Sequence, residues 1–349
     1  MKAEIAEQPA MLRRIVTDGG PDIASVAAEI GRRRPRFVLL AARGTSDHAA
    51  LYAKYLIEVV LGLPAGLVSP SSMTVYGARP QLTDVLFLAV SQSGGSPDLI
   101  DSLTVARECG ATTVAVTNNA GSALARAAEF SVDVRAGAEL AVAATKTYTA
   151  ELLALYLLLA PLSGASSPGA GTGTAELAAL ADAAEATLAL EDGVVEAAAR
   201  YRFANRLVTT ARGFSYPTAR EGALKLMETS YLGAQAFSGA DLLHGPMAMI
   251  DAELPVVAVV TPGPGGQAMA PVLERLRQRE ADLLVVGTVP EGLAGSTVRS
   301  LPVVTSGVPE RLQPILEILP LQLLALHLAL QRGGDPDAPR GLSKVTETW

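Results

Sequence analysis

Short runs of apolar, mostly β-branched residues alternate with longer helical stretches along the whole chain. This alternation is typical of α/β proteins with parallel sheets. The pattern predicts eight strands in two series of four. The first series covers residues 36–44, 85–92, 112–118 and 130–137, and the second covers 205–213, 255–263, 282–288 and 299–307.

The two series repeat one another at a nearly constant spacing. ARGTS at residue 42 recurs as ARGFS at residue 211, and ATTVAV at residue 111 corresponds to ADLLVV at residue 281. The offset stays between 169 and 171 residues over five elements, which chance similarity between valine-rich strands would not produce. We therefore expect an internal duplication: two α/β domains, each a doubly wound parallel sheet flanked by helices.

The predicted organisation has five parts. A lead-in segment covers residues 1–25, the first domain 26–162, a Gly/Ser/Pro-rich linker 163–175, the second domain 176–333 and a tail without periodic pattern 334–349. A chain of 349 residues that is 49% hydrophobic can bury two cores of this size.

Charge and composition exclude several classes of protein. The net charge of −7 leaves no basic face for nucleic acid, and the run GRRRPR at 31–36 is interpreted as a solvated helix end. The single cysteine, Cys109, excludes intrachain disulfides and a cysteine-based zinc site. The first residues lack the apolar core of a signal peptide, and the longest apolar stretches fall short of the roughly 20 residues that span a bilayer. We expect a cytoplasmic protein without a membrane partner.

One loop has the composition of a phosphate site. In LAVSQSGGSPDLI (88–100) an apolar run ends in polar residues, Ser96 is a candidate N-cap and a proline follows it. Two glycines allow close backbone approach, and the hydroxyls of Ser91, Ser93 and Ser96 lie beside the positive end of a helix dipole. This suits a phosphate monoester, although an ordinary capped turn is the alternative. The corresponding loop of the second series, TPGPGG, has no serine, so the chemistry is expected in the first half only.

A second polar loop, ARGTSDH at 42–48, ends the first predicted strand. Its Thr45 and Ser46 either cap the following helix, which is the favoured interpretation, or offer hydroxyls to a ligand at the same sheet edge. His48 is expected on the helix surface.

The candidate acid–base residues lie in the second half. A predicted helix within 215–231 places Glu221, Lys225 and Glu228 within an arc of about 60° on one face. They form either a solvated ion-pair stripe or a site where a lysine tunes a carboxylate that moves protons. His244 precedes Gly-Pro in a loop and is either a ring-opening acid/base or a turn-stabilising residue, whereas His327 is expected in the core or an interface.

The tail contains a single lysine. Lys344 lies in DPDAPRGLSKVTETW (335–349), which is either a frayed end or a mobile segment whose amine can form a Schiff base with a carbonyl.

Taken in order, SQSG, EGALKL.E.SY, HGP and PRxLxK carry a resemblance to the sugar isomerase (SIS) domain family over nearly the whole chain. The resemblance implies two tandem SIS domains, each a flavodoxin-like three-layer sandwich. Within the family the chain is most similar to the SIS-type glucosamine-6-phosphate deaminases and to the isomerase half of glucosamine-6-phosphate synthases.

The resemblance also implies roles for individual residues. Ser91, Gln92, Ser93 and Ser96 match the loop that grips the sugar phosphate, with Ser46 added from the neighbouring loop. Glu228 matches the carboxylate that moves a proton between C1 and C2, with Lys225 beside it.

Three further positions match the family pattern. His244 matches the ring-opening histidine that relatives supply from a partner subunit, which implies a homodimer. Lys344 matches the lysine that engages the open-chain ketose, and Val142 matches a backbone contact to the sugar. No metal or organic cofactor is implied.

Departures from the synthase pattern decide the expected reaction. Gly95 replaces a glutamate and Ala144 a serine near the sugar, which leaves the exact hexosamine open. The glutaminase domain of the synthases begins with a nucleophilic cysteine, and it is not expected here because the single cysteine is Cys109. We therefore expect conversion of glucosamine 6-phosphate to fructose 6-phosphate and ammonia. One alternative is an isomerase or deglycase of a tagatose, galactosamine or fructosamine phosphate. The other is a non-catalytic sugar-phosphate sensor.

Overall fold

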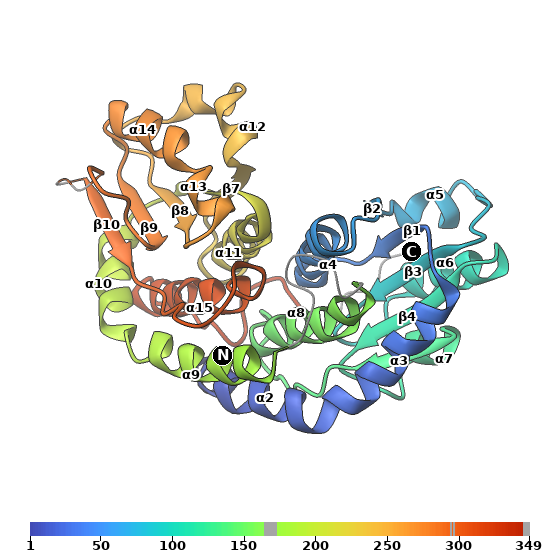
Figure 1. Cartoon of the computed structure of the whole chain (residues 1–349). Coiled ribbons are helices and arrows are strands. Elements are labelled where there is room, and N and C mark those ends of the chain that lie inside the picture. The colour runs from blue at the N-terminus through green and yellow to red at the C-terminus, as the bar shows by residue number, and fades with distance from the viewer. Residues whose placement is uncertain (164–172, 294, 296, 345–349) are drawn as a thin grey trace. The chain divides into compact units, whose positions relative to one another are not determined.

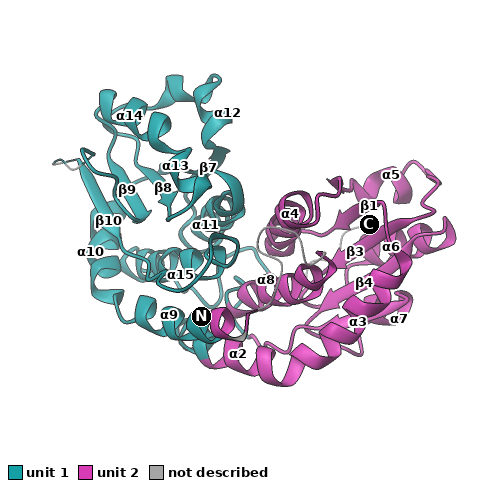
Figure 2. Ribbon diagram, in the orientation of Figure 1, with its two compact units in different colours: residues 1–9, 140–145, 178–342 teal, residues 10–139, 146–177, 343–349 magenta. Residues whose placement is uncertain are grey.

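The computed structural model describes residues 1–163, 173–293, 295 and 297–344 (Figure 1). Nine of the 13 residues of the predicted linker, 164–172, lie outside the described residues, and its last two belong to a helix that begins at Thr174. The chain divides into two compact units (Figure 2), each built from separate segments. Unit 1 comprises Met1–Pro9, Leu140–Thr145 and Ala178–Leu342, and unit 2 comprises Ala10–Glu139, Lys146–Leu177 and Ser343–Trp349.

Unit 2 is built on a five-stranded sheet in which every pairing is parallel. Its strands are β1 (Phe37–Ala41), β2 (Ala65–Leu67), β3 (Val85–Val90), β4 (Thr112–Thr117) and β5 (Phe130–Asp133). The spatial order is β2-β1-β3-β4-β5, the flavodoxin-like order. In the register Phe37 lies opposite Val85, so the carboxyl ends of β1 and β3 are neighbours.

Helices cover both faces of this sheet. They are α2 (Gln8–Arg14), α3 (Gly20–Arg33), α4 (Thr45–Leu56), α5 (Pro70–Thr74), α6 (Pro97–Glu108), α7 (Ala123–Ala127) and α8 (Lys146–Leu159), with the shorter turns η1 (Ile15–Gly19), η2 (Ile57–Leu61) and η3 (Ala160–Leu162). Helices α3 and α4 pack on α8, whereas α5 and α7 pack on α6. Phe87 and Ala89 of β3 belong to the core beneath α6, and the alternate residues of the strand face the other way. Burial on both faces explains why the strand is a continuous apolar run.

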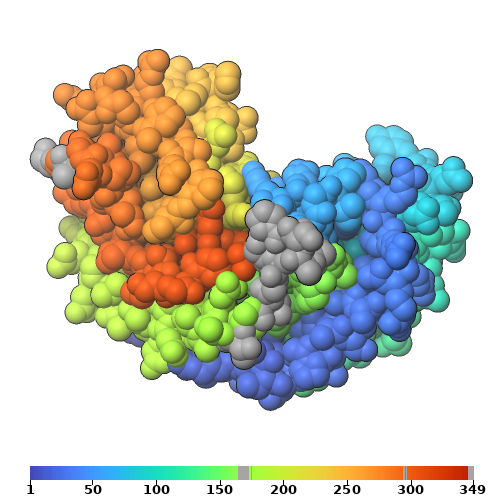
Figure 3. Space-filling model, in the orientation of Figure 1, coloured from blue at the N-terminus to red at the C-terminus, as the bar shows by residue number. Residues whose placement is uncertain are grey.

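The basic run predicted to be a solvated helix end lies at the end of α3, and all of its residues but Pro35 are exposed. The first part of the chain, which contains this run, is blue in Figure 3. Arg33 pairs with Glu129 at 2.5 Å, and Arg32 pairs with Glu29. Surface ion pairs within the unit account for these two charges.

Unit 1 repeats the sheet. Its strands are β6 (Arg206–Ala211), β7 (Gly233–Ser238), β8 (Val256–Val260), β9 (Leu283–Gly287) and β10 (Val298–Leu301), in the order β10-β9-β8-β6-β7 and all parallel. Counted within each sheet, this is the same 2-1-3-4-5 order. The predicted duplication and fold class are confirmed.

The helices of unit 1 include one long apolar core helix, α15 (Pro314–Gln331). The others are α1 (Lys2–Ala6), α9 (Thr174–Leu188, which begins in unit 2), α10 (Glu191–Tyr201), α11 (Tyr216–Ser230), α12 (Gly239–Leu243), α13 (Pro264–Gln267) and α14 (Ala270–Gln278), with the turns η4 (Gly213–Ser215), η5 (Pro246–Met249) and η6 (Glu310–Leu312). α15 packs against both α10 and α11. The stretch Glu310–Gln331 is long and apolar enough to cross a membrane, but 94% of its apolar 18-residue window is buried within the protein, as in a core helix.

Candidate functional site

The predicted phosphate loop follows β3 at the carboxyl edge of the sheet in unit 2. Ser91 Oγ accepts the Gly94 N–H (3.2 Å), and Ser93 Oγ accepts the Gly95 N–H (3.3 Å). Both hydroxyls act as acceptors in these bonds, so their protons remain able to donate to a ligand. Ser96 is the N-cap residue of α6, as predicted, but its side chain makes no capping hydrogen bond.

Gly94 is required by the shape of this loop. Its φ is +62°, and a Cβ placed there would lie 2.3 Å from Ser122 Oγ. Glycine tolerates both the left-handed backbone and the close approach. The loop can therefore curl tightly enough to hold its hydroxyls on one side of the sheet edge.

The second polar loop lies beside the first because β1 and β3 are neighbours. Thr45 opens α4, with Gly44 as its N-cap, and the Ser46 hydroxyl donates to Glu151 at 2.9 Å. Ser46 is buried, so in this structure its hydroxyl has an internal acceptor. His48 is also buried, at 7% exposure, and the expectation of a surface histidine was wrong: α4 turns this side into the unit.

Sequence reasoning missed a cation near the loop. Arg43 pairs with Asp98 through Nε (2.8 Å) and a terminal nitrogen (2.7 Å), and Asp98 lies in the first turn of α6. The loop itself has no Lys or Arg, but the fold brings a guanidinium from the neighbouring loop to its helix. Only the adjacency of β1 and β3 reveals this, since the two residues are far apart in sequence.

In unit 1, α11 carries a buried ion triad. Lys225 Nζ lies 2.5 Å from Glu228 Oε2 and 3.3 Å from Glu221 Oε1. The side chains of Lys225 and Glu221 have no exposed surface, whereas that of Glu228 is 24% exposed. The interpretation as a solvated stripe was wrong, because the triad faces the interior and only one carboxylate reaches the surface.

The charge of Lys225 is held by its two carboxylate neighbours. Burial alone would lower the pKa of the Lys225 ammonium, but Glu221 and Glu228 outweigh burial and raise the pKa above its usual value. The ammonium therefore stays positively charged beside the Glu228 carboxylate.

His244 follows α12 and precedes Gly245, whose φ of +124° turns the chain into η5. The imidazole is exposed and makes no hydrogen bond to any residue that the structure describes. It therefore does not stabilise the turn through a side-chain bond. By contrast His327 is mostly buried, with Nε2 2.7 Å from Glu191, in agreement with a core position.

Val142 belongs to unit 1, and its N–H donates to the Asp337 carbonyl at 3.1 Å. The N–H groups of Leu140 and Ala141 both donate to Glu4 Oε1. Because the Val142 N–H is already bonded, the backbone group of Val142 that remains for a sugar contact is its carbonyl oxygen.

Lys344 belongs to unit 2, where its Nζ lies 2.7 Å from Glu139 Oε2. The tail is thus tied down at this residue, and the rest of the predicted tail, 345–349, lies outside the described residues.

The loop of unit 1 that corresponds to the phosphate loop holds a carboxylate of its own. Glu310 accepts the Gly265 N–H at 2.8 Å, and a Cβ at Gly263 would lie 2.4 Å from the Glu310 carboxyl carbon. The two loops have therefore diverged: the loop in unit 2 presents serine hydroxyls, whereas the loop in unit 1 is occupied by the side chain of Glu310.

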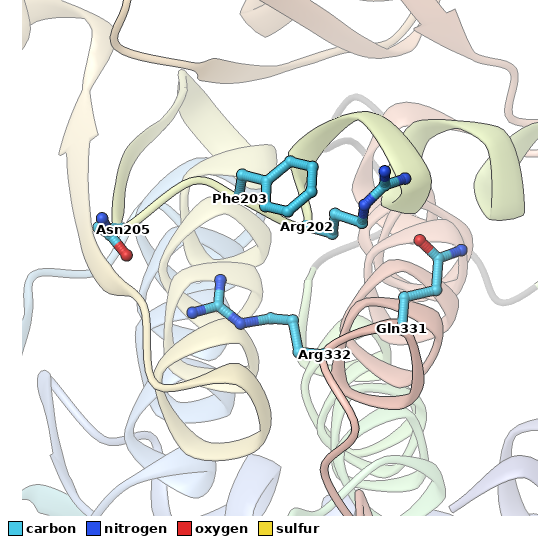
Figure 4. Close-up of a pocket in the computed structure, with 5 residues that line it drawn as sticks. All are labelled: Arg202, Phe203, Asn205, Gln331 and Arg332. Carbon is cyan, nitrogen blue, oxygen red and sulfur yellow. The ribbon is translucent and has the colours of Figure 1, made fainter.

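A surface pocket of about 380 Å³ in unit 1 contains none of the predicted site residues. Its lining residues are Arg202, Phe203, Asn205, Gln331 and Arg332 (Figure 4). The Arg202 guanidinium stacks on Phe203 at 4.4 Å, and Arg332 donates to the Ala204 carbonyl at 2.7 Å. Among the described residues no group of three His, Cys, Asp or Glu side chains is placed to hold a metal ion.

Comparison with known proteins gives consistent matches. The family described as SIS domain matches residues 33–161 and 201–332. The chain is 36% identical over 345 residues to the isomerizing glutamine–fructose-6-phosphate aminotransferase of Methanothermobacter thermautotrophicus, covering 99% of this chain and 56% of that protein. The enzyme of the same name from Gloeobacter violaceus is 37% identical over 355 residues, with 99% and 58% covered. The chain thus spans little more than half the length of these relatives.

Two solved structures share the fold over nearly their whole length. The C-terminal domain of glucosamine-fructose-6-phosphate aminotransferase from Francisella tularensis has a TM-score of 0.88 and 28% identity, covering 97% of this chain and 98% of that chain. A Silicibacter pomeroyi protein provisionally described as a phosphosugar isomerase has a TM-score of 0.85 and 34% identity, covering 97% and 99%.

Proposed function

This chain belongs to the SIS domain family, and we propose that it is an enzyme that converts glucosamine 6-phosphate to fructose 6-phosphate and ammonia. The observation that carries the proposal is the triad on α11: a partly exposed carboxylate, Glu228, backed by the sealed ammonium of Lys225. A carboxylate next to an α-carbon can transfer the C2 proton to C1 without a metal.

The phosphate of the substrate is assigned to the loop Ser91–Ser96. The hydroxyls of Ser91 and Ser93 keep their protons for donation, and Ser96 and Gln92 add further polar groups at the start of α6. Thr45 and Ser46 border this edge from the neighbouring loop. Binding energy from the phosphate would then fix the sugar for the chemistry elsewhere.

His244 is proposed to open the sugar ring from a second copy of the chain. α11 leads from the end of β6 back to the start of β7, so Glu228 lies near the amino edge of this sheet. His244 follows the end of β7 and lies at the opposite edge, a strand length of about 20 Å away. Within one chain the two groups are too far apart to act on one sugar, which favours a homodimer.

Lys344 is proposed to supply the amine that engages the open-chain ketose carbonyl. In the deaminating direction this amine adds to the C2 imine and displaces ammonia, which leaves a Schiff base between the lysine and C2. Water then hydrolyses this Schiff base to the ketose and the free amine, so the hydrolysis of the C2 imine is divided into two easier steps. In the structure this amine is paired with the Glu139 carboxylate.

The direct test is to incubate the purified chain with glucosamine 6-phosphate and to measure ammonia and fructose 6-phosphate. Glu228→Gln should abolish turnover while leaving the fold intact, because the amide keeps the shape of the side chain. Glu253→Gln, an exposed carboxyl of the same unit, is the matched control and should keep wild-type activity. Turnover that survives Glu228→Gln unchanged would falsify this mechanism.

A second candidate is synthesis in the opposite direction, favoured by 36–37% identity to isomerizing aminotransferases. Fructose 6-phosphate with ammonia should then yield glucosamine 6-phosphate. A panel that adds tagatose, galactosamine and fructosamine phosphates tests the substrates left open by Gly95 and Ala144. Tight binding of one phosphosugar with no turnover of any would identify a sensor instead.

A further inference from the structure

A buried carboxylate that the proposed mechanism does not use lies directly against the tail lysine. Glu139 follows the loop after β5, and its side chain has no exposed surface. A buried carboxylate without partners would be costly, so its contacts show what it is placed to do.

Two of those contacts orient Glu139 within unit 2 independently of the tail. Its Oε1 accepts the Thr147 N–H at 3.1 Å, and its Oε2 accepts the Thr147 hydroxyl at 2.7 Å. Thr147 is in the first turn of α8, where free N–H groups and the helix dipole favour a negative charge. The carboxylate is therefore held in one orientation by the body of the unit.

The third contact is to the tail. Lys344 Nζ lies 2.7 Å from the same Oε2 that binds the Thr147 hydroxyl, and the Lys344 side chain is only 25% exposed. Residues 139 and 344 are 205 positions apart, so this contact joins two segments that are separated by more than half of the chain. The Glu139 carboxylate is held in place by unit 2, and the Lys344 ammonium that it binds is partly covered. Together the two groups form a docking site for the tail.

We propose that Glu139 is a positioning residue that docks Lys344 and holds its amine in reserve until the substrate arrives. The inference rests on the proposed function only in taking Lys344 as the amine that engages the sugar. An ammonium has no lone pair to attack a carbonyl, so its proton must pass to the Glu139 carboxylate and the pair must open before the amine reacts. Glu139 thus determines both the position of the Lys344 amine before the substrate binds and the ease with which the ion pair opens.

Labelling of the resting protein tests this without any sugar. Acetylation of Lys344 by an N-hydroxysuccinimide ester is followed by mass spectrometry and normalised to Lys54, a lysine of the same unit that is 30% exposed and paired with Glu58. Loss of a charge-assisted pair worth about 1 kcal/mol corresponds to about a fivefold change. Glu139→Gln should therefore raise the labelling rate of Lys344 about fivefold. Glu129→Gln, which removes a surface ion pair with Arg33, should leave it unchanged.

Activity gives a second readout that simple destabilisation would not imitate. Glu139→Gln should lower kcat about tenfold while KM stays near wild type, because the phosphate loop is untouched. Glu139→Asp keeps the charge and should restore part of the kcat. If Glu139→Gln fails to fold, Thr147→Val removes only the orienting hydroxyl and should raise labelling about twofold.

The outcomes separate the docking proposal from the function. Wild-type labelling of Lys344 in a folded Glu139→Gln protein, or in Thr147→Val, overturns the docking role even if the enzyme turns over sugar. Faster labelling in a protein that turns over no phosphosugar supports docking and refutes the proposed function instead.

Discussion

Glu317 makes the stability of unit 1 depend on pH. Its carboxyl lies fully buried in α15 and accepts hydrogen bonds from the hydroxyls of Ser215 (2.8 Å), Thr218 (3.1 Å) and Thr261 (2.6 Å). Burial raises the pKa of the carboxyl from 4.5 to about 7; the three hydroxyls oppose this shift and the charge of Glu310 adds to it.

The direction of the pH dependence follows from the two pKa values. The folded chain binds this proton more tightly than the unfolded chain, so the group stabilises the fold while it is protonated. That contribution is fully present below about pH 4.5, reaches a maximum of about 3 kcal/mol, and disappears as the pH rises through about 7. Between about pH 5.5 and about pH 8 the loss amounts to about 2 kcal/mol in the free energy of unfolding.

Replacement of Glu317 by Gln removes the titration and keeps the shape of the side chain. Urea unfolding followed by far-ultraviolet circular dichroism at the two pH values should show that the wild type loses about 2 kcal/mol more than Glu317→Gln. Glu253→Gln controls for other titrating groups and should track the wild type. A variant that keeps the full pH dependence of the wild type would refute the assignment of a raised pKa to this carboxyl.

Three further results are expected. Lys225→Met should lower the free energy of unfolding by about 3–5 kcal/mol in urea titrations, because it leaves Glu221 charged and buried; a loss below about 1 kcal/mol contradicts the burial of this pair. Gly94→Ala should raise KM for the sugar phosphate more than about tenfold, since its Cβ meets Ser122; an unchanged KM places the phosphate elsewhere. Gly222→Ala should lower stability by about 1 kcal/mol, because the clash of its Cβ with Leu321 Cδ1 at 2.8 Å exceeds the gain in helix propensity; a stabilised variant shows that the leucine yields freely.

Eight of the ten strands could be read from the sequence. β5 and β10 are partly exposed edge strands, and the other six are inner strands of the two sheets, largely buried on both faces. Such strands are apolar and β-branched without interruption, as in VLFLAV of β3 and VVAVV of β8. The repeated spacing then identified the duplication. The two strands that escaped, β2 (AGL) and β7 (GAQAFS), are edge strands made of small and polar residues, which carry no apolar period.

The chain alone determines residue types and their local spacing, and these suffice to place a lysine between two carboxylates on one helix face. The burial of that helix face, however, is not determined by local sequence. Whether that face is wet or sealed depends on α15, which packs on α11 from a segment about a hundred residues away. Tertiary structure likewise brought Arg43 to the phosphate loop and Glu139 to the tail lysine. Electrostatics acts through space, so the partners of a charge appear only when distant segments meet.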